Sequence, residues 1–510
     1  MNRRRFLQSS AAALAATSLP LGWRRVEAGS FRLRTRPRLT FYGSNPQVSG
    51  SCHLLETTQG LYVIDCGLFM SDVRDAAAEN RELPFDPKEV KAMFLTHAHV
   101  DHMGRIPLLY KRGFRGKIYC TDCTRDLTAI MLDSGPRERS KEDIEDMGGP
   151  EDAEGALGLL AAQPYNSRVK KDGLEFRFTD AGHILGSAMV EVWADGAKVL
   201  FGGDMGPSHS PILCRATQHF GADAVLVEST YGPVPTEPID FQEFGRKLQK
   251  VIDGGGSVLI PAFALHKTQI IIYILHRLIR EKILDSKVYI YSDSSTAQKC
   301  TKVYNDFREY YDPEAKKEDK LFYKNRYREM SGRDSLETHG NAPAIYISTS
   351  GMLDHANAPK HLVRMADNEK NACFVVGYQA PNSVGRKLLN GEKRIKVPVE
   401  EEGPDGKFFR DLKDCDIKLQ VEKISGFSSH APGQEILEWV AGFKEIGELY
   451  VVHGDEDRST GLAEAAARMG VNAVAPKRGE TFEVIGERVK PGSPPKLTKK
   501  SGGELAPVDK

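Results

Sequence analysis

The chain has 510 residues, 40% of them hydrophobic and 27% charged, and this composition excludes a fibrous, collagen-like or wholly disordered protein. Lys and Arg total 70, as do Asp and Glu, so the formal net charge is zero and no global positive field would attract a polyanion. A nucleic-acid partner would have to be held by a local site. No run of 18 apolar residues occurs, so the sequence predicts neither a membrane-spanning helix nor a stable membrane anchor.

The first 28 residues resemble a twin-arginine export signal. Three consecutive arginines at 3–5 precede a modest apolar stretch at 11–21, and the small-x-small sequence at 26–28 is typical of a cleavage site. This pattern predicts a signal peptide over 1–28, and export of the folded protein by the twin-arginine machinery to the periplasm or beyond. The alternative is a disordered basic N-terminus.

Short apolar strands follow, rich in β-branched residues and ending at polar or glycine positions. The pattern predicts strands at 60–67, 90–96, 117–121, 174–179, 198–201 and 224–227. Residues 134–173 are charged and rich in glycine, which favours a surface excursion with short helices.

The pattern changes between 254 and 350. A strand at 257–261, a helix at 266–284 and strands at 287–292 and 344–348 indicate a second α/β unit. Helices are then expected at 433–443 and 462–469, and the Lys- and Pro-rich tail at 489–510 is expected to be disordered.

Metal-binding residue types are concentrated in the segment His97-Ala98-His99-Val100-Asp101-His102, directly after a predicted strand. Residues two apart in an extended segment point the same way, so His97 and His99 can reach one metal ion. Asp101 and His102, at the turn into a helix, would face another.

Three further candidate ligands, His183, Asp204 and His453, follow later apolar runs that would deliver them to the same sheet edge. Imidazole and carboxylate ligands suit zinc, although ligand type alone does not exclude manganese or iron. Two ions about 3.5 to 4 Å apart lower the pKa of water and clamp the oxygens of a phosphodiester. The pattern therefore predicts metal-assisted hydrolysis.

These residues, together with the strand end at Asp65, resemble the metallo-β-lactamase fold. The segments at 228–232, 261–264, 350–352 and 426–430 narrow the resemblance to the β-CASP nuclease branch, over residues 40–484. The resemblance implies an α/β protein: an αββα sandwich built from 39–232 and 423–488, with a β-CASP cap domain inserted at 233–422.

The resemblance also implies how the metal ligands divide between two zinc ions. One ion would be bound by His97, His99 and His183. The other would be bound by Asp101, His102 and His453. Asp204 would bridge them, and a hydroxide shared by the two ions would be the nucleophile.

Catalytic roles follow from the same resemblance. Asp65 would orient ligands or the attacking water. Glu228 would pair with His430, which would act as the general acid on the leaving 3′ oxygen. A carboxylate partner keeps such a histidine protonated and oriented, so the residue types agree with the role.

Single-stranded RNA is the expected substrate, because DNA-processing members of the branch carry valine at the position of His453. The leading prediction is thus a zinc-dependent endoribonuclease. The alternative is an exported metallo-hydrolase of another class, acting on DNA, on another phosphodiester or on a carboxylic ester or lactone. A third reading is a non-catalytic RNA-binding protein. The sequence does not fix the oligomeric state or an exonuclease mode.

Two residues depart from the pattern of the resembled branch. Pro432 stands where Asp is common, and Lys267 where Arg is common, which exchanges a bidentate phosphate fork for a point charge. His266, His355 and Lys267 either approach the substrate or are solvated loop residues. The remaining isolated histidines, at 53, 209, 219, 276, 339 and 361, are predicted to be packing or surface groups.

Overall fold

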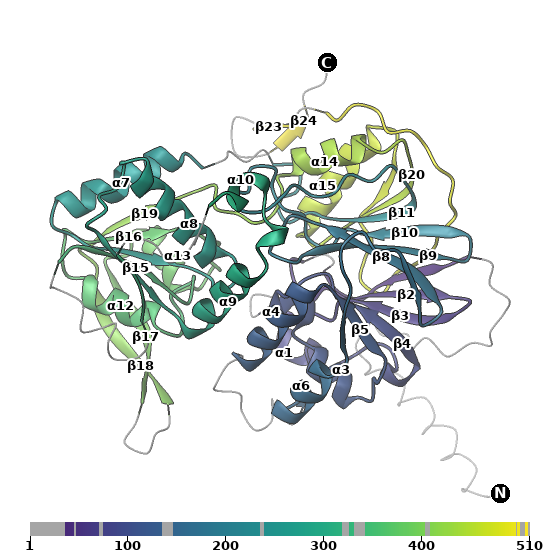
Figure 1. The fold of residues 1–510 in the computed structure, drawn as a ribbon, viewed down its shortest axis with the longest axis horizontal. Helices are drawn as coiled ribbons and strands as arrows, with labels where there is room; N and C mark the ends of the chain where they lie inside the picture. The colour runs from purple at the N-terminus through teal and green to yellow at the C-terminus, as the bar shows by residue number, and fades with distance from the viewer. Residues whose placement is uncertain are drawn as a thin grey trace, which may run out of the picture.

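The computed structural model describes residues 36–44, 47–70, 75–134, 146–234, 239–318, 326–330, 342–402, 408–495, 497–499 and 505–507. The predicted signal peptide at 1–28 lies outside the described residues. The described chain forms two seven-stranded sheets and one six-stranded sheet, with helices between and around them (Figure 1).

The first sheet has the strand order β22-β1-β2-β3-β4-β5-β6. Its first half is antiparallel, whereas β3, β4, β5 and β6 run parallel to one another. The strands are β1 (Arg38–Phe41), β2 (His53–Thr57), β3 (Gly60–Ile64), β4 (Val90–Phe94), β5 (Lys117–Cys120), β6 (Leu160–Ala162) and β22 (Thr481–Glu483).

The second sheet has the order β21-β20-β11-β10-β9-β8-β7, and its strands β10, β11 and β20 are parallel neighbours. The strands are β7 (Val169–Lys171), β8 (Leu174–Asp180), β9 (Ala188–Ala194), β10 (Ala197–Phe201), β11 (Gly221–Glu228), β20 (Glu445–Val452) and β21 (Asn472–Val474). The 134–173 segment differs from its prediction, because it also supplies the edge strands β6 and β7. Each of these strands is only three residues long, too short to show an alternating pattern in the sequence.

The two sheets pack face to face through an aromatic core. Phe94 of the first sheet meets Phe176 of the second edge-on, with ring centroids 4.8 Å apart. Helices cover the outer faces (Figure 1): α2 (Val100–Met103), α3 (Ile106–Lys111), α4 (Asp122–Asp133) and α6 (Pro150–Leu157) on one side, α14 (Gly433–Ala441) and α15 (Glu456–Ala467) on the other. The predicted αββα sandwich is confirmed.

The cap forms a third, all-parallel sheet in the order β14-β13-β15-β12-β16-β19. Its strands are β12 (Val258–Pro261), β13 (Tyr289–Asp293), β14 (Tyr327–Met330), β15 (Ala344–Ser348), β16 (Ala372–Val375) and β19 (Gln420–Lys423). Alternate residues of β12 fall in two separate apolar clusters, so both faces of this sheet are covered, as parallel sheets require. The inserted α/β cap is confirmed.

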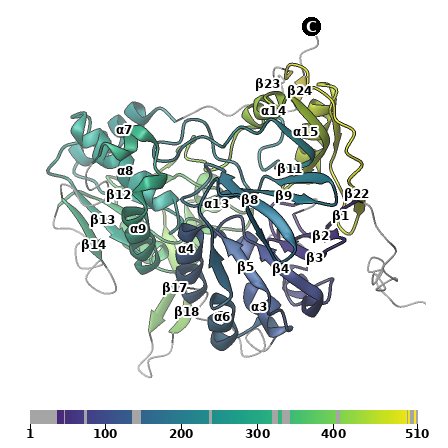
Figure 2. The same cartoon turned by 45° about the vertical axis from the view of Figure 1, so that its right-hand side comes forward.

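Helices α7 (Phe241–Asp253), α8 (Lys267–Arg280) and α9 (Ser295–Asp306) cover one face of the cap sheet. The other face carries α12 (Ala358–Met365), α13 (Val384–Leu389) and the hairpin of β17 (Arg394–Glu402) and β18 (Phe408–Asp416). Helices α4 and α9 lie side by side in both views, which places the cap against the sandwich (Figure 2). Short helices complete the chain: α1 (Ala76–Glu79), α10 (Pro313–Lys316), η1 (Pro87–Glu89) and η2 (Arg308–Tyr310).

The tail differs from the expected disorder in its described part. Val489 pairs with Ile446 in an isolated bridge, and β23 (Leu497–Lys499) pairs with β24 (Leu505–Pro507). All eight cysteines are free. Within the ranges given above, no helix is both long enough and apolar enough to cross a membrane.

Candidate metal centre and active site

The predicted ligands lie at the carboxyl ends of strands from both sheets. Because β10, β11 and β20 are parallel neighbours, Asp204, Glu228 and His453 emerge at one edge of the second sheet. His97 follows β4, and α2 begins at Val100, which sets Asp101 and His102 on the turn facing that edge.

Three imidazoles converge on one point. The Nδ1 atom of His99 is 3.1 Å from Nε2 of His97 and 3.0 Å from Nε2 of His183. The Oδ2 atom of Asp204 is 3.7 Å from the first of these Nε2 atoms and 3.6 Å from the second. These four ligand atoms all lie within 4.8 Å of one another, close enough to share one ion.

A second cluster forms beside the first from Asp101, His102 and His453. The Oδ1 atom of Asp204 is 3.3 Å from Nε2 of His102 and 3.6 Å from Nδ1 of His453. The two oxygens of Asp204 therefore face different clusters. The geometry brings together all seven ligands predicted from the sequence.

Three of the histidine rings are also hydrogen-bonded through the nitrogen that points away from the ligand clusters, and these bonds orient the rings. Thr96 places Oγ1 3.1 Å from Nδ1 of His97, Asp65 places Oδ2 2.7 Å from Nδ1 of His102, and His183 donates from Nδ1 to the Ser429 carbonyl over 2.8 Å. Outer partners of this kind fix the tautomer and direction of a metal-binding histidine. Asp65 also accepts hydrogen bonds from Thr96 N–H and Oγ1, both at 2.8 Å.

The clusters fit divalent metal ions because several of their buried polar atoms have no hydrogen-bond partner. They are His102 Nε2, both Asp204 carboxylate oxygens and both His453 ring nitrogens. Such groups are costly to bury unpaired, and a cation would satisfy them. Burial lowers the pKa of His99 and of His453 to about 3, and holds the pKa of His97 and His183 well below the usual value. Neutral imidazoles with a carboxylate are the ligands that zinc takes.

Two residues at the site have backbone conformations that are rare outside glycine. Asp65 has a φ of 58° and His453 a φ of 56°. The His453 N–H donates to the Ser44 carbonyl over 2.7 Å, which helps to hold this conformation. Strained residues of this kind cluster at functional sites, where the surrounding structure maintains them.

The buried Glu228 and the partly exposed His430 form a pair next to both clusters. The Nδ1 atom of His430 is 3.0 Å from each Glu228 carboxylate oxygen and 3.8 Å from Asp204 Oδ2. Burial by itself lowers the pKa of His430, but the Glu228 charge and hydrogen bond outweigh it and raise the pKa to about 9. Since Nδ1 faces Glu228, Nε2 is left to act on a substrate.

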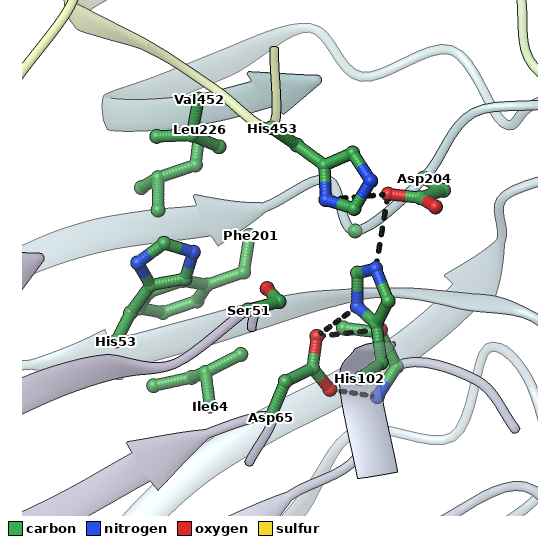
Figure 3. A pocket seen from close by; sticks show the side chains of 12 residues that line it. Ser51, His53, Ile64, Asp65, His102, Phe201, Asp204, Leu226, Val452 and His453 are labelled. Atoms are coloured by element: carbon green, nitrogen blue, oxygen red, sulfur yellow. Dashed lines mark hydrogen bonds and ion pairs between the residues drawn. The ribbon is translucent and has the colours of Figure 1, made fainter. Parts of the chain in front are cut away.

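Behind the second cluster lies a small cavity lined by His53, Ser51, Ile64 and Phe201 (Figure 3). The ring of His53 is buried, Nδ1 has no hydrogen-bond partner, and burial lowers the pKa of the imidazole to about 3. The figure shows this ring turned away from the Asp204 carboxylate, in agreement with its predicted packing role.

The sequence reasoning missed the outer partners Thr96 and Ser429. Thr96 precedes the histidine-rich segment directly, so its position was a usable signal. The Ser429 group is a backbone carbonyl, and it lies 246 residues from His183 in the sequence. The residue type at 429 therefore gave no indication of this contact. Lys267 is buried, and its ammonium donates to the Phe427 carbonyl rather than standing free for a phosphate. Pro432 is the N-cap residue of α14 and makes no side-chain capping bond, as its departure from the pattern suggested.

The αββα sandwich, the two ligand clusters and the inserted cap define a metal-dependent hydrolase of the metallo-β-lactamase class. Family comparisons agree. Residues 45–230 match the Metallo-beta-lactamase superfamily, 268–388 match the Beta-Casp domain, and 414–476 match the Zn-dependent metallo-hydrolase RNA specificity domain.

Curated relatives cover most of the chain. Ribonuclease TTHA0252 of Thermus thermophilus is 32% identical, over 88% of this chain and 100% of the relative. An RNase J-like protein of Methanocaldococcus jannaschii is 31% identical, over 83% of this chain and 94% of the relative. Transcription termination factor FttA of the same organism is 28% identical, over 85% of this chain and 69% of the relative. A solved protein of unknown function from Enterococcus faecalis shares the fold with a TM-score of 0.51 at 12% identity, covering 88% of this chain and 100% of that one.

The chain therefore belongs to the β-CASP family of the metallo-β-lactamase superfamily. The predicted alternative, a metallo-hydrolase of another class, is not favoured by these relatives.

The predicted export to the periplasm or beyond is wrong by the same comparison. The relatives are ribonucleases and transcription termination factors, and transcription termination takes place where RNA is made, in the cytoplasm. The prediction rested on the arginine-rich segment at 1–28. That segment precedes the three family matches, which begin at residue 45.

Proposed function

We propose that this chain is an endoribonuclease that cleaves single-stranded RNA with two zinc ions and a general acid, His430. The observation that carries the proposal is the pairing of buried Glu228 with the partly exposed His430, 3.0 Å apart and adjacent to both ligand clusters. Hydrolysis of a carboxylic ester or lactone on such a core would not need this pair. The names of the relatives, which include ribonucleases, support RNA as the substrate.

In the proposal His97, His99 and His183 would hold one ion and Asp101, His102 and His453 would hold the other, with one carboxylate oxygen of Asp204 available to each cluster. Manganese or iron would be compatible with the same donor atoms. Bound divalent ions supply a nucleophile at neutral pH by lowering the pKa of water, and stabilise the charge of the transition state. Asp65 keeps His102 in the orientation that presents Nε2 to the site.

His430 supplies the proton that the leaving oxygen requires. The Nδ1–H of His430 donates a hydrogen bond to Glu228. When the ring is protonated, its second proton is on Nε2, and this is the atom that can face a leaving group. Glu228 is fixed in turn, because its Oε1 accepts the Met205 N–H over 2.9 Å. The carboxylate thus both orients the ring and favours its protonated form.

The cap would select a flexible single strand. It is anchored to the sandwich close to the site: Lys267 of α8 donates to the Phe427 carbonyl, and the Tyr304 hydroxyl of α9 accepts the Leu185 N–H over 3.2 Å. Both contacts adjoin the segments that carry His430 and His183. An RNA substrate must therefore enter between the cap and the sandwich. A flexible single-stranded RNA fits such a space more readily than a duplex.

A cleavage assay with 5′-labelled RNA and DNA of one sequence tests the proposal. Cleavage of the single-stranded RNA at internal positions, abolished by a chelator and restored by zinc, is expected. His430→Ala should reduce kcat by about 10²- to 10⁴-fold while retaining the metal content of the wild type. Lys282→Ala, at an exposed residue just beyond the C-terminal end of α8, serves as a control of equal activity. RNA left intact by metal-replete wild-type protein would sink the proposal.

A further inference from the structure

His266 lies at a strained point between β12 and α8 of the cap. Its φ of 67° and ψ of −53°, with a 2.9 Å hydrogen bond from Lys267 N–H to the Leu265 carbonyl, make a γ-turn of the positive-φ kind. This turn is rare and strained for any residue with a side chain. His266 is the N-cap of α8, yet its side chain makes no capping bond. The ring is therefore available for a contact other than helix capping.

The ring is buried and held from the α9 side. Its exposed fraction is 5%, and its Nδ1 is 2.7 Å from the Tyr304 hydroxyl. The same hydroxyl accepts the Leu185 N–H, two residues after His183. Tyr304 thus connects the His266 ring to the loop that carries a predicted metal ligand.

The other side of the ring faces a pocket between the cap and the sandwich. His266 lines this pocket together with His209 and Ser210, which follow Asp204, and with Phe427 and Ser428, which precede His430. Among the residues that the structure describes, none forms a hydrogen bond with His266 Nε2.

We propose that His266 is a substrate-binding residue of the nuclease, whose Nε2–H donates to a non-bridging phosphate oxygen of the RNA strand next to the cleaved bond. The inference rests on the proposed function. The Tyr304 hydroxyl donates to Nδ1 and so fixes the neutral tautomer with its proton on Nε2. Burial, which holds the pKa of His266 well below its usual value, agrees with a neutral donor.

His266→Gly tests the inference, because glycine adopts this φ without strain and removes only the ring. The variant should fold and keep its zinc, because the relief of backbone strain offsets part of the loss of the buried ring. Its KM for single-stranded RNA should rise about ten-fold with kcat changed less than about two-fold, the result of losing one hydrogen bond to a charged group. Lys282→Gly, at another positive-φ residue with a φ of 61°, is the matched control and should leave KM unchanged.

Two further measurements identify the kind of contact. Tyr304→Phe should raise KM in the same direction, and His266→Gln, whose amide nitrogen can take the place of Nε2, should recover part of the loss. Binding of labelled oligouridylate to His430→Ala protein should show the same dependence on salt with and without His266→Gly, because a neutral donor releases no counterion. A cationic contact would change the slope of log K against log salt by about 0.7.

An unchanged KM in His266→Gly, or a fall in kcat that tracks loss of zinc, would overturn the inference. Either result would leave the proposed function standing, since the wild type would still cleave RNA. Failure of the wild type to cleave RNA would instead contradict the proposed function.

Discussion

At the scale of single residues, the site is built from pairs in which a side chain or a backbone carbonyl orients a histidine ring. Asp65 holds His102, the Ser429 carbonyl holds His183, and Glu228 holds His430, with donor–acceptor distances of 2.7, 2.8 and 3.0 Å. Each of these groups contacts Nδ1 of its histidine and leaves Nε2 to face the site. Changes in these groups should therefore weaken metal binding or proton transfer while leaving the ligands in place.

Asp65→Asn should lower zinc affinity by about 10- to 100-fold, since the amide is a poorer acceptor for the His102 N–H. Zinc content measured at a series of buffered free-zinc concentrations checks this. Asp195→Asn makes the same change at a half-buried residue that also has a positive φ, of 48°, and should bind zinc as the wild type does. Equal zinc affinity for Asp65→Asn and the wild type would show that Asp65 does not support the metal.

Glu228→Gln should shift the pH profile of kcat. The general acid must be protonated, so activity falls as the pH rises through the pKa of His430, which the Glu228 carboxylate raises from 6.5 to about 9. Bound metal cations act in the opposite direction, so the alkaline limb of the wild type should lie between these values. Without the carboxylate the limb should move to lower pH. A pH–rate profile of both proteins with an unmoved limb would contradict the role of Glu228.

At the scale of elements, a buried ion cluster joins three strands of the second sheet. Glu191 of β9 accepts hydrogen bonds or ion-pair contacts from Arg177 of β8, Lys198 of β10 and His219, and its side chain has an exposed fraction of 0%. Burial raises the pKa of Glu191, but these three partners outweigh it and hold the pKa well below its usual value. The cluster fixes the register of strands whose ends carry His183 and Asp204.

Glu191→Gln should destabilise the fold at pH 7 by about 2 kcal/mol, the value of a buried hydrogen bond to a charged group. A carboxylate with a depressed pKa stabilises the folded state above its unfolded pKa of about 4.3, and this stabilisation is lost as the pH falls toward the folded pKa. The difference in Tm between variant and wild type should therefore shrink between pH 5 and pH 3, a window set by about that unfolded pKa. A difference that persists unchanged at low pH would contradict the charge as its cause.

At the scale of the whole molecule, the zero net charge and the two ligand clusters predict recruitment of RNA only at the metal centre. Bound divalent ions are the largest local charges in such a site. Metal-free His430→Ala protein should bind single-stranded RNA at least about ten-fold more weakly than the zinc-loaded form, measured by fluorescence anisotropy. Tight, strongly salt-dependent binding by the metal-free protein would show an extended basic surface instead.

Much of the candidate site was predictable because its ligands follow strand ends that the apolar pattern marks. The segment at 97–102 and the strand ends before His183, Asp204 and His453 are local signals, and the structure gathers all of them. The strands β1 and β2 and the edge strands β6 and β7 were not predicted, and each takes its place in the structure by pairing with its neighbours. Helix α15 begins at Glu456, earlier than the apolar residues at 462–469 suggested.

The sequence by itself determined the fold class and, through its resemblance to the β-CASP branch, indicated seven candidate metal ligands and a Glu228–His430 pair. Only the tertiary structure decided which oxygen of Asp204 faces which cluster, that Lys267 is buried against the Phe427 carbonyl, and that His266 lies in a strained turn against Tyr304. Those facts depend on contacts between residues far apart in the chain. The spacing of residues along the sequence does not predict such contacts, because they form only when the sheets pack together.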